Sequence, residues 1–315
     1  ERHPEHGGAG GLQGGLSGPE KGPGAMTIWN LGSINADYAY SVPHLPGPGE
    51  TVAARALDRG LGGKGANISV AAARAAARVV HVGAVGPDGR WAAERLLEYG
   101  VDTRHIAEVG ELTGHAVIAV EPGGENAIVI WPGANAEIPD AARDAALAEA
   151  RPGDLAVAQN ETTGQAEWLA AARGLGLRAA YVAAPFDRHA TQAALPHADL
   201  LILNAVEARQ LSEAAGRAPG ALGVADVIVT RGAEGCTWHG PEGARDFPAD
   251  PVEAVDATGA GDTFAGYLLA GLDRGFPMPQ AIAMAQTAAA LMVARRGTAD
   301  VIPDLAEVQA ARGAP

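Results

Sequence analysis

The sequence predicts an α/β fold in which a mostly parallel central sheet is flanked by helices and carries a small β-sheet lid. Three observations lead to this prediction. After residue 140, short apolar runs alternate with longer segments of helical length, which is the pattern of a covered parallel sheet. Around residues 36–59 and 112–132, β-like runs are interrupted by Pro and Gly instead. The chain has 315 residues, 47% of them hydrophobic, which suffices for one large domain.

The chain begins with an extension, residues 1–25, that we expect to be disordered. It is rich in Gly, has scattered Pro and charge, and shows no apolar periodicity, so it cannot bury enough surface to offset its ordering entropy. The sequence leaves open whether it belongs to the native protein. The first credible strand begins at Thr27, directly after Met26, and we expect residues 26–315 to form a single domain.

The first half of that domain is predicted to mix central strands with the lid. Apolar strands are expected over residues 27–32 and 79–85, and helices over about 67–77 and 88–99. The segment 112–132 has the pattern of a hairpin, and we pair it with residues 36–59 to form the lid. Three aromatic residues of these segments either line the inner face of the lid or only pack it. They are Tyr38, Tyr40 and Trp131.

The second half reads as repeated βα units. Strands are expected near residues 155–159, 178–182, 200–203 and 227–230, and late helices over 261–274 and 279–293. Ligands of parallel sheets collect at the carboxyl ends of the strands. Polar residues stand at those ends: Glu161, Asn204, Glu207 and the segment 230–235.

Composition restricts the classes of partner. The net charge is −14, which argues against nucleic acid or an anionic membrane as the main partner, because both need clustered cations. ATP stays possible, since Mg²⁺ and helix N-termini offset charge locally. The sequence has no run of roughly twenty apolar residues and no secretory signal pattern, and its single cysteine, Cys236, permits no internal disulfide. We therefore expect a cytoplasmic protein in which Cys236 is buried.

Residues 255–266 read V-D-A-T-G-A-G-D-T-F-A-G and predict a glycine turn that opens a helix. Free amides at a helix start bind anions, and the helix dipole strengthens that binding. An acid at this place would compete with the anion unless it acts as a base, taking a proton from a hydroxyl while the amides hold a phosphoryl group. Asp262 is the candidate for that base. The plainer interpretation is that Asp262 only caps the helix.

Two further stretches offer polar groups for a small ligand. Asn35 and Asp37 lie two apart on an extended segment, so their side chains point to the same side and suit adjacent hydroxyls, although a strand end explains them equally well. Residues 60–65 spell G-L-G-G-K-G, but the preceding residues look too polar for the strand of a dinucleotide fingerprint, and Gly65 stands where a Walker A loop needs Ser or Thr. We expect a glycine turn feeding a helix. Apart from Lys21, its Lys64 is the only lysine of the chain.

Both motifs resemble signatures of one family. The run D-A-T-G-A-G-D-T-F at 256–264 resembles the C-terminal signature of the ribokinase family of sugar kinases (the PfkB type), and G-G-K-G-A-N at 62–67 resembles its N-terminal signature. The resemblance covers residue 26 to about residue 303 and implies a ribokinase-like fold and an ATP-dependent phosphotransferase that acts on an alcohol group.

The resemblance also implies roles for individual residues. Asp262 matches the general base, and Gly259, Ala260 and Gly261 match the anion hole. The positions that contact the sugar are Asn35, Asp37, Gly63, Lys64, Asn67 and Glu161, together with Asp262. Asn204 and Glu207 match an N-x-x-E element that orders Mg²⁺ and phosphate largely through water; the same spacing is also that of a capping box.

Nucleotide and monovalent-cation positions follow in the same way. The nucleotide positions are Thr230, Gly232, Gly235, Gly261 and Gln286, the last near the adenine. The positions of a K⁺ site are Asp256, Thr258, Met292, Arg295 and Gly297. Val301 stands where ribokinases carry Ser, which leaves open whether K⁺ activation is retained.

The first hypothesis for the reaction is transfer of the γ-phosphoryl group of ATP to the primary hydroxyl of D-ribose. It relies on G-S-I-N-A-D, G-G-K-G-A-N and the G-A-N-A of residues 133–136 occurring together. Another sugar or a nucleoside is the alternative, since the three lid aromatics could hold a base, and a non-catalytic binding protein on the same scaffold is a third hypothesis. Members of the family often pair through their lids, so we expect a homodimer.

Overall fold

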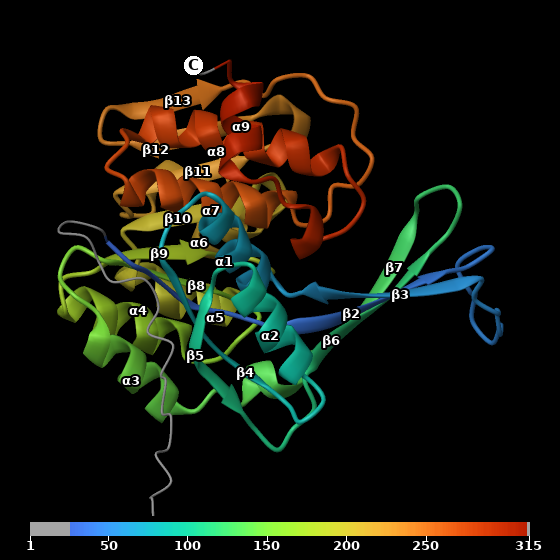
Figure 1. Ribbon diagram of the computed structural model, residues 1–315. Coiled ribbons are helices and arrows are strands. Elements are labelled where there is room, and N and C mark those ends of the chain that lie inside the picture. Colours follow the sequence, from blue (N-terminus) through green and yellow to red (C-terminus); the bar gives the residue numbers. More distant parts are fainter. Residues whose placement is uncertain (1–25, 314–315) are drawn as a thin grey trace, which may run out of the picture.

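The computed structural model describes residues 26–313 and contains two separate sheets (Figure 1). The extension expected over residues 1–25 lies outside the described residues. In the described part of the chain, the central sheet has nine strands in the order β13-β12-β11-β10-β9-β8-β1-β4-β5. Their bounds are β1 Ile28–Leu31, β4 Val79–Val85, β5 Asp102–Glu108, β8 Leu155–Gln159, β9 Arg178–Val182, β10 Leu200–Asn204, β11 Asp226–Thr230, β12 Cys236–Gly240 and β13 Gly243–Phe247.

The strands of the central sheet are parallel from β5 to β11, as the alternation of strands and helices predicted. The strands β12 and β13 form an antiparallel hairpin at one edge, which the sequence analysis did not predict. The edge strand β13 is paired on one side only and is mostly exposed, so its sequence lacks the continuous apolar run that marks the inner strands.

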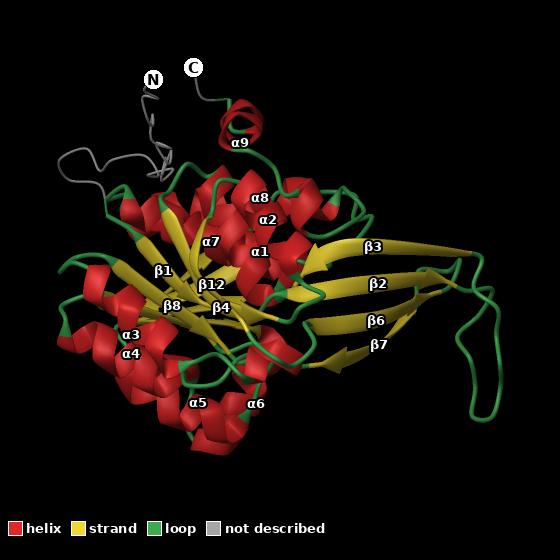
Figure 2. Cartoon of the chain, turned by 60° about the horizontal axis from the view of Figure 1, so that its bottom comes forward, coloured by secondary structure: helices red, strands yellow, loops and turns green. Residues whose placement is uncertain are grey.

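Helices cover both faces of the central sheet (Figure 2). One hydrophobic core joins one face of the sheet to α1, α2, α7, α8 and α9, and a second core joins the other face to α3, α4, α5 and α6. The bounds of the helices are α1 Lys64–Arg74, α2 Arg90–Glu98, α3 Asp140–Glu149, α4 Gln165–Gly174, α5 Arg188–Ala194, α6 Ala205–Ala215, α7 Ala260–Asp273, α8 Met278–Val293 and α9 Leu305–Ala311. Cys236 is fully buried in the first core, as expected.

The small sheet projects from the body and is built from the two expected segments (Figures 1 and 2). Its strands are β2 Asn35–Ser41, β3 Ala56–Gly62, β6 Gly114–Val120 and β7 Asn126–Trp131, in the order β3-β2-β6-β7. One prediction was wrong here: the residues before G-L-G-G-K-G, judged too polar for a strand, belong to β3. That strand is antiparallel to β2 in the small sheet, so the motif still lacks the parallel central strand of a dinucleotide site.

The helix α1 begins three residues earlier than predicted, at Lys64 instead of Asn67. Gly63, at φ +92°, stands at its N-cap, a backbone conformation that glycine adopts without strain. The helix also ends earlier, since Ala76 already has φ +61°. An Ala-rich run gives no signal for either boundary, so the sequence placed the helix correctly and its ends incorrectly.

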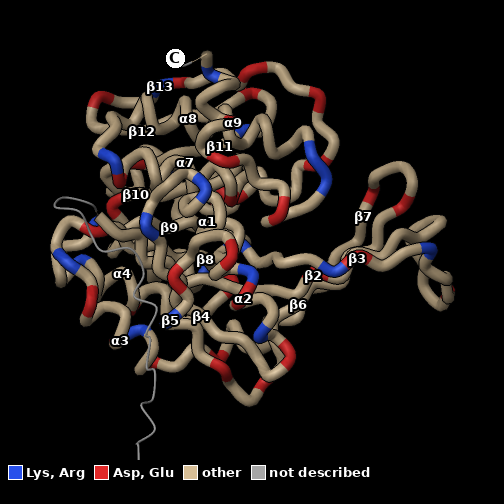
Figure 3. Tube along the Cα trace, in the orientation of Figure 1, with Lys and Arg blue, Asp and Glu red and all other residues tan. Residues whose placement is uncertain are grey.

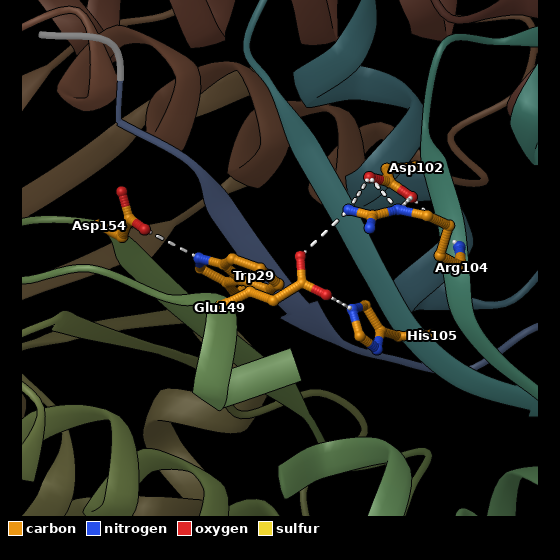
Figure 4. Close-up of polar contacts among 6 residues, drawn as sticks. All are labelled: Trp29, Asp102, Arg104, His105, Glu149 and Asp154. Carbon is orange, nitrogen blue, oxygen red and sulfur yellow. Dashed lines mark hydrogen bonds and ion pairs between the residues drawn. The ribbon is translucent and has the colours of Figure 1, made fainter. Parts of the chain in front are cut away.

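A cluster of polar contacts fixes the edge strand β5, which the sequence also did not predict (Figure 4). Glu149 of α3 accepts from Arg104 Nη2 at 3.2 Å and lies 3.2 Å from His105 Nε2. Next to it, Asp154 accepts from Trp29 Nε1 at 3.0 Å. Side chains of β5 thus bind α3. These contacts explain how a strand with the polar sequence D-T-R-H-I-A-E is stabilised at the edge of the central sheet.

None of the helices between residues 26 and 313 has the length and apolar character needed to cross a membrane. Basic and acidic positions are interspersed along the chain, as Figure 3 shows.

Candidate functional site

Most of the predicted site residues lie where the central strands end and where α1 and α7 begin. Asn204 of β10 pairs in register with Thr230 of β11, so these two positions are neighbours at one edge of the sheet. A cavity of about 290 Å³ opens beside the ends of β1 and β8. Two predicted sugar-binding residues, Asn35 and Glu161, line it together with Ile130, Pro132, Asn135, Ala136, Asn160, Thr162, Thr163 and Pro185.

The first turn of α7 brings a buried carboxylate against the first turn of α1. Gly259, at φ +76°, stands at the N-cap of α7, a conformation that favours glycine, and a Cβ there would press on the end of the Met292 side chain. Asp262 is 8% exposed, and its Oδ2 accepts from Asn67 Nδ2 at 2.9 Å. Residues 195 positions apart in the sequence are therefore in direct contact, and Ala260 and Gly261 begin the helix beside them.

The turn before α1 is held by a serine that the sequence analysis did not single out. Ser33 Oγ donates to Glu161 Oε2 at 2.6 Å and accepts from the amide of Gly65 at 3.2 Å. The amide of Lys64 donates to the same Glu161 oxygen at 3.0 Å. Glu161 thus fixes the start of α1. These contacts place its carboxylate next to Lys64, another of the predicted sugar-binding residues.

Asn35 and Asp37 point to the same side of β2, as the two-residue spacing predicted. Asp37 packs against Gly62, where a Cβ would overlap its carboxylate. Asn35 accepts at Oδ1 from Asn135 Nδ2 at 2.8 Å, and Asn135 Oδ1 accepts from the amide of Ile34 at 2.8 Å. With its oxygen occupied in this way, Asn35 has its amide N–H groups available for a ligand.

Asn135 belongs to the G-A-N-A motif, but the sequence alone offers no reason to assign it a role of its own. It is 1% exposed, in a 3₁₀ turn over Gly133–Ala136. An asparagine between small residues was the available signal, but only the fold shows that it reaches residue 35 across 100 positions.

One lysine faces four carboxylates at this site. Lys64 has its pKa raised, first by the charge of Asp262 and then by those of Glu161, Glu207 and Asp37, against the opposing effect of burial. Burial raises the pKa of Asp262, and Lys64 and the hydrogen bond from Asn67 oppose that rise. Lys64 is thus the charge that favours the ionised form of Asp262.

Asp37 is the second strongly affected carboxylate. Burial, together with the charges of Glu161 and Asp262, raises its pKa to about 7, and Lys64 acts in the opposite direction. Two like charges near one carboxylate disfavour its ionised form, so the site holds more acidic groups than the charge of Lys64 compensates.

Asn204 and Glu207 form the capping box that their spacing allowed. Asn204 Oδ1 accepts from the amide of Glu207 at 2.9 Å, and Glu207 Oε2 accepts from the amide of Asn204 at 2.8 Å. Glu207 is 8% exposed, and burial raises its pKa while Lys64 lowers it. One oxygen of Asn204 and one oxygen of Glu207 are thus engaged in the cap. The capping role is compatible with the predicted role of the two residues in ordering Mg²⁺ and phosphate through water.

The loop after β11, predicted to bind the nucleotide, contains a short 3₁₀ turn. Thr230 Oγ1 donates to Leu203 O at 3.3 Å, and a 3₁₀ turn over Gly232–Glu234 follows, closed by the amide of Gly235 on Gly232 O at 3.0 Å. Gln286 of α8 donates to Phe247 O at 2.9 Å, and Phe247 O also lies against Gly235. Gln286 and Gly235 therefore gather at the end of β13.

The residues predicted to hold a monovalent cation lie on two loops that contact each other. The amides of Val255 and Asp256 donate to Val293 O at 2.7 and 3.0 Å. The Asp256 carboxylate accepts from Thr258 N at 2.9 Å and from Gly297 N at 3.4 Å. A carboxylate is an oxygen ligand that a hard cation accepts, whereas Met292 O already accepts from Arg295 N at 3.0 Å.

A divalent ion has no ready protein cage: within residues 26–313, no three His, Cys, Asp or Glu side chains are grouped so as to hold a metal. The carboxylates around Lys64 act on one another electrostatically but do not form such a group.

The lid aromatics lie on the face of the small sheet opposite to the predicted sugar-binding pair. Side chains alternate along β2, so Tyr38 and Tyr40 point away from the face that carries Asn35 and Asp37. Trp131 pairs in register with His115 and shares that opposite face, where the ring of His115 lies edge-on to Tyr38. These three residues therefore do not face the predicted sugar-binding pair, which favours the alternative that they only pack the lid.

The comparisons with known proteins agree with this geometry. The model for the pfkB family carbohydrate kinases matches residues 27–305. The ribokinase of Haemophilus influenzae is 34% identical over 292 residues, which cover 88% of this chain and 95% of that protein. The deoxyribokinase of Salmonella typhimurium is 29% identical over 295 residues, which cover 89% of this chain and 96% of that protein.

Two solved structures share the fold over nearly their whole length. The ribokinase of Cryptococcus neoformans in complex with ADP has a TM-score of 0.79 and 31% identity, covering 91% of this chain and 99% of that one. The ribokinase of Arabidopsis thaliana complexed with ribose and ATP has a TM-score of 0.79 and 26% identity, covering 91% and 98%.

Proposed function

The chain belongs to the pfkB family of carbohydrate kinases, and from this premise we propose that it transfers the γ-phosphoryl group of ATP to the primary hydroxyl of D-ribose. The observation that carries the proposal is the junction of α1 and α7, where Asn67 binds the buried carboxylate of Asp262 beside the only lysine of the region. Such a junction unites a base, a cation and the amides of a helix start, the three groups that phosphoryl transfer to an alcohol requires.

In the proposed reaction, Asp262 removes the proton of the acceptor hydroxyl. The hydroxyl oxygen then forms a bond to the γ-phosphorus of ATP while the bond from that phosphorus to the bridging oxygen of ADP breaks. Asn67 orients the carboxylate, and Lys64 favours its ionised form. The products are a sugar phosphate and ADP, and the proton stays on Asp262 until it is released to solvent.

The negative charge that develops on the phosphoryl group faces the amides of Gly259, Ala260 and Gly261 at the start of α7. Asn204 and Glu207 would order Mg²⁺ through water, and the ion would neutralise phosphate charge when bound. Asp256, Thr258, Met292, Arg295 and Gly297 would hold K⁺, which would add positive potential beside the same turn. The nucleotide would lie along Thr230, Gly232, Gly235 and Gln286.

For the sugar, we propose that Asn35 and Asp37 bind adjacent hydroxyls, the first as donor and the second as acceptor. The oxygen of Asn35 is held by Asn135, and Asp37 lies two residues along the same face of β2. Gly63, Lys64, Asn67 and Glu161 complete the set. In Asn67, Oδ1 is buried and has no hydrogen-bond partner, so it is ready to accept from a hydroxyl.

A 2-deoxypentose is the second candidate, because a deoxyribokinase is among the relatives. A nucleoside is less well supported, since the lid aromatics lie on the far face of β2. The test is ADP release by the purified chain with D-ribose, 2-deoxy-D-ribose, D-fructose and inosine, followed by identification of the phosphorylated carbon by NMR. D-Ribose is expected to give the highest kcat/KM, with phosphate on carbon 5. If no sugar in the panel releases ADP, the proposal fails.

We further propose that the chain works in the cytoplasm as a homodimer that pairs through the small sheet. Apolar side chains on that sheet are exposed to solvent, led by Val129 at 70% and Trp131 at 51%. Both stand on β7, which is an edge strand. Exposed apolar residues on a sheet edge favour association with another copy.

A further inference from the structure

A side chain from the end of the chain binds the small sheet just before the sugar site. Thr298 Oγ1 donates to the carbonyl of Leu61, at the end of β3, at 2.8 Å. The two residues are 237 positions apart. Leu61 precedes Gly62, which packs against Asp37, and Gly63, which begins α1. Displacement of this carbonyl therefore changes the position of residues proposed to bind the sugar.

The same segment also contacts the loop proposed to serve the phosphate side. Gly297, the neighbour of Thr298, donates its amide to Asp256 Oδ2 at 3.4 Å. Asp256 in turn accepts from Thr258, directly before the anion turn that begins at Gly259. One short path of adjacent groups thus runs from the anion turn, through residues 297–298, to β3.

The segment is fastened from its other side to the body of the protein. Arg74 of α1 donates to the carbonyl of Ile302 and, at 3.2 Å, to that of Asp300. Arg95 and Tyr99 bind the carboxylate of Asp300. Residues 300–302 are therefore anchored to α1 and α2. Thr298 lies between this anchor and the two segments that residues 297–298 contact, the loop at Asp256 and the end of β3.

We infer that Thr298 is a positioning residue that couples the nucleotide side of the site to the sugar side, so that each ligand strengthens the binding of the other. Nucleotide binding that orders the turn at 256–259 also sets Gly297 and Thr298. The Thr298 hydroxyl then holds β3 and the start of α1 in the arrangement that binds the sugar. This inference rests on the proposed function, because it takes the two sides to be sites for ATP and a pentose.

The plainer alternative is that Thr298 only closes the surface between β3 and the last segment. The side chain is half-buried, and water could replace its hydroxyl. The two interpretations differ in what they predict for binding: a surface contact affects stability, whereas a coupling residue affects the sugar affinity only when nucleotide is present.

Calorimetry of the full chain separates them. The dissociation constant of D-ribose is measured alone and with saturating Mg²⁺ and a non-hydrolysable ATP analogue, in wild type, Thr298→Val and Thr298→Ser. In wild type, the analogue is expected to tighten ribose binding. Thr298→Val, which keeps the shape but has no hydroxyl, is expected to reduce this enhancement by roughly three- to tenfold, and Thr298→Ser to retain it.

Thr237→Val is the matched control, since Thr237 donates to Asp246 at 2.6 Å within the β12–β13 hairpin. It is expected to keep the wild-type enhancement. Equal enhancement in Thr298→Val and wild type, or no enhancement in wild type, would overturn the inference. If Thr298→Val does not fold, Thr298→Ala is measured against Thr298→Ser in the same way. Failure of the proposed function is distinguishable, because wild type would then neither bind nor phosphorylate ribose.

Discussion

Asp262 combines two properties that conflict in most carboxylates, since it is buried and is still the proposed base. Burial raises its pKa, and the compensating groups, Lys64 and Asn67, both come from α1. The sequence motif suggested a base because an acid at an anion-binding helix start is otherwise unfavourable. Its partner Asn67 could be named only through the family resemblance, because nothing in the local sequence connects residues so far apart.

Asp262→Asn is expected to lower kcat by ~10² or more while ribose and ATP dissociation constants stay nearly unchanged, because the amide keeps the size of the carboxylate and cannot take the proton. Steady-state rates and calorimetry measure the two effects. Asp144→Asn on the exposed side of α3 serves as control and should behave as wild type. A variant with unchanged kcat and a raised KM would identify Asp262 as a helix cap instead.

Asp37 shows how a binding residue reduces stability before the ligand arrives. Its pKa of about 7 in the folded protein lies above the ordinary 3.8 that we take for the unfolded chain. Because the folded state binds this proton more tightly than the unfolded chain does, protonation of Asp37 stabilises the fold. This contribution to the free energy of unfolding is fully present below about pH 4 and is lost as the pH rises through about 7.

Asp37→Asn cannot ionise and therefore escapes this loss. Relative to wild type without substrate, the variant is expected to gain roughly 1–2 kcal/mol in free energy of unfolding between pH 5 and pH 8. Urea unfolding at the two pH values measures it, and Asp58→Asn, on the exposed neighbouring strand β3, should show no such gain. If Asp37→Asn and wild type differ in free energy of unfolding by the same amount at both pH values, Asp37 does not titrate as proposed. The variant should also bind ribose more weakly.

At the scale of the elements, the sequence predicted the strands whose both faces are buried and missed β5 and the β12–β13 hairpin at the two edges of the central sheet. The strands at 155–159 and 178–182 were placed correctly because five-residue apolar runs are bounded by polar turns. The segment of β3 was expected in the lid, but its first residues were judged too polar for a strand, because they are exposed and only the pairing with β2 stabilises them. Neither the capping box at Asn204 nor the start of α7 depended on distant contacts, so both were predictable.

The loop at Asp256 is the element for which we propose a function that depends on an ion. Asp256 joins the turn before α7 to Gly297, and the family resemblance implies that K⁺ binds beside it. Val301 offers no side-chain oxygen, but backbone carbonyls and the carboxylate remain. We expect K⁺ to raise the initial rate several-fold over Na⁺ or tetramethylammonium at equal ionic strength, with a weaker ion affinity than in relatives that carry Ser.

Initial rates in the three chloride salts measure this effect, and Asp256→Ala should lose the potassium-specific increase. A second readout is independent of turnover: K⁺ should raise the melting temperature of wild type in the absence of ATP, and this shift should vanish in Asp256→Ala. Equal rates and equal melting temperatures in all three salts would mean that Asp256 only caps the turn through its two amide hydrogen bonds.

At the scale of the whole molecule, the sequence predicted the composition of the site better than its geometry. Residues from both halves of the chain were assigned to it through two motifs, and the parallel sheet explains why they meet, since the carboxyl ends of the strands share one edge. What the sequence could not provide were the contacts that hold the assembly, such as Asn135 on Asn35 and Thr298 on Leu61. These join segments whose proximity arises only from the tertiary fold.

The small sheet projects from the body and leaves apolar side chains in solvent, which is why we expect a second copy to cover it (Figure 1). Light scattering at about 10 µM should give twice the chain mass for wild type. This concentration is chosen because an interface of ordinary size binds at micromolar or below.

Val129→Asp places a charge on the most exposed apolar residue of the small sheet and should shift the mass towards one chain, because a buried unpaired charge is costly. Leu175→Asp, at a position 45% exposed next to α4 on the main body, should stay dimeric. A monomer mass for wild type, or equal masses for the two variants, would contradict pairing through the small sheet.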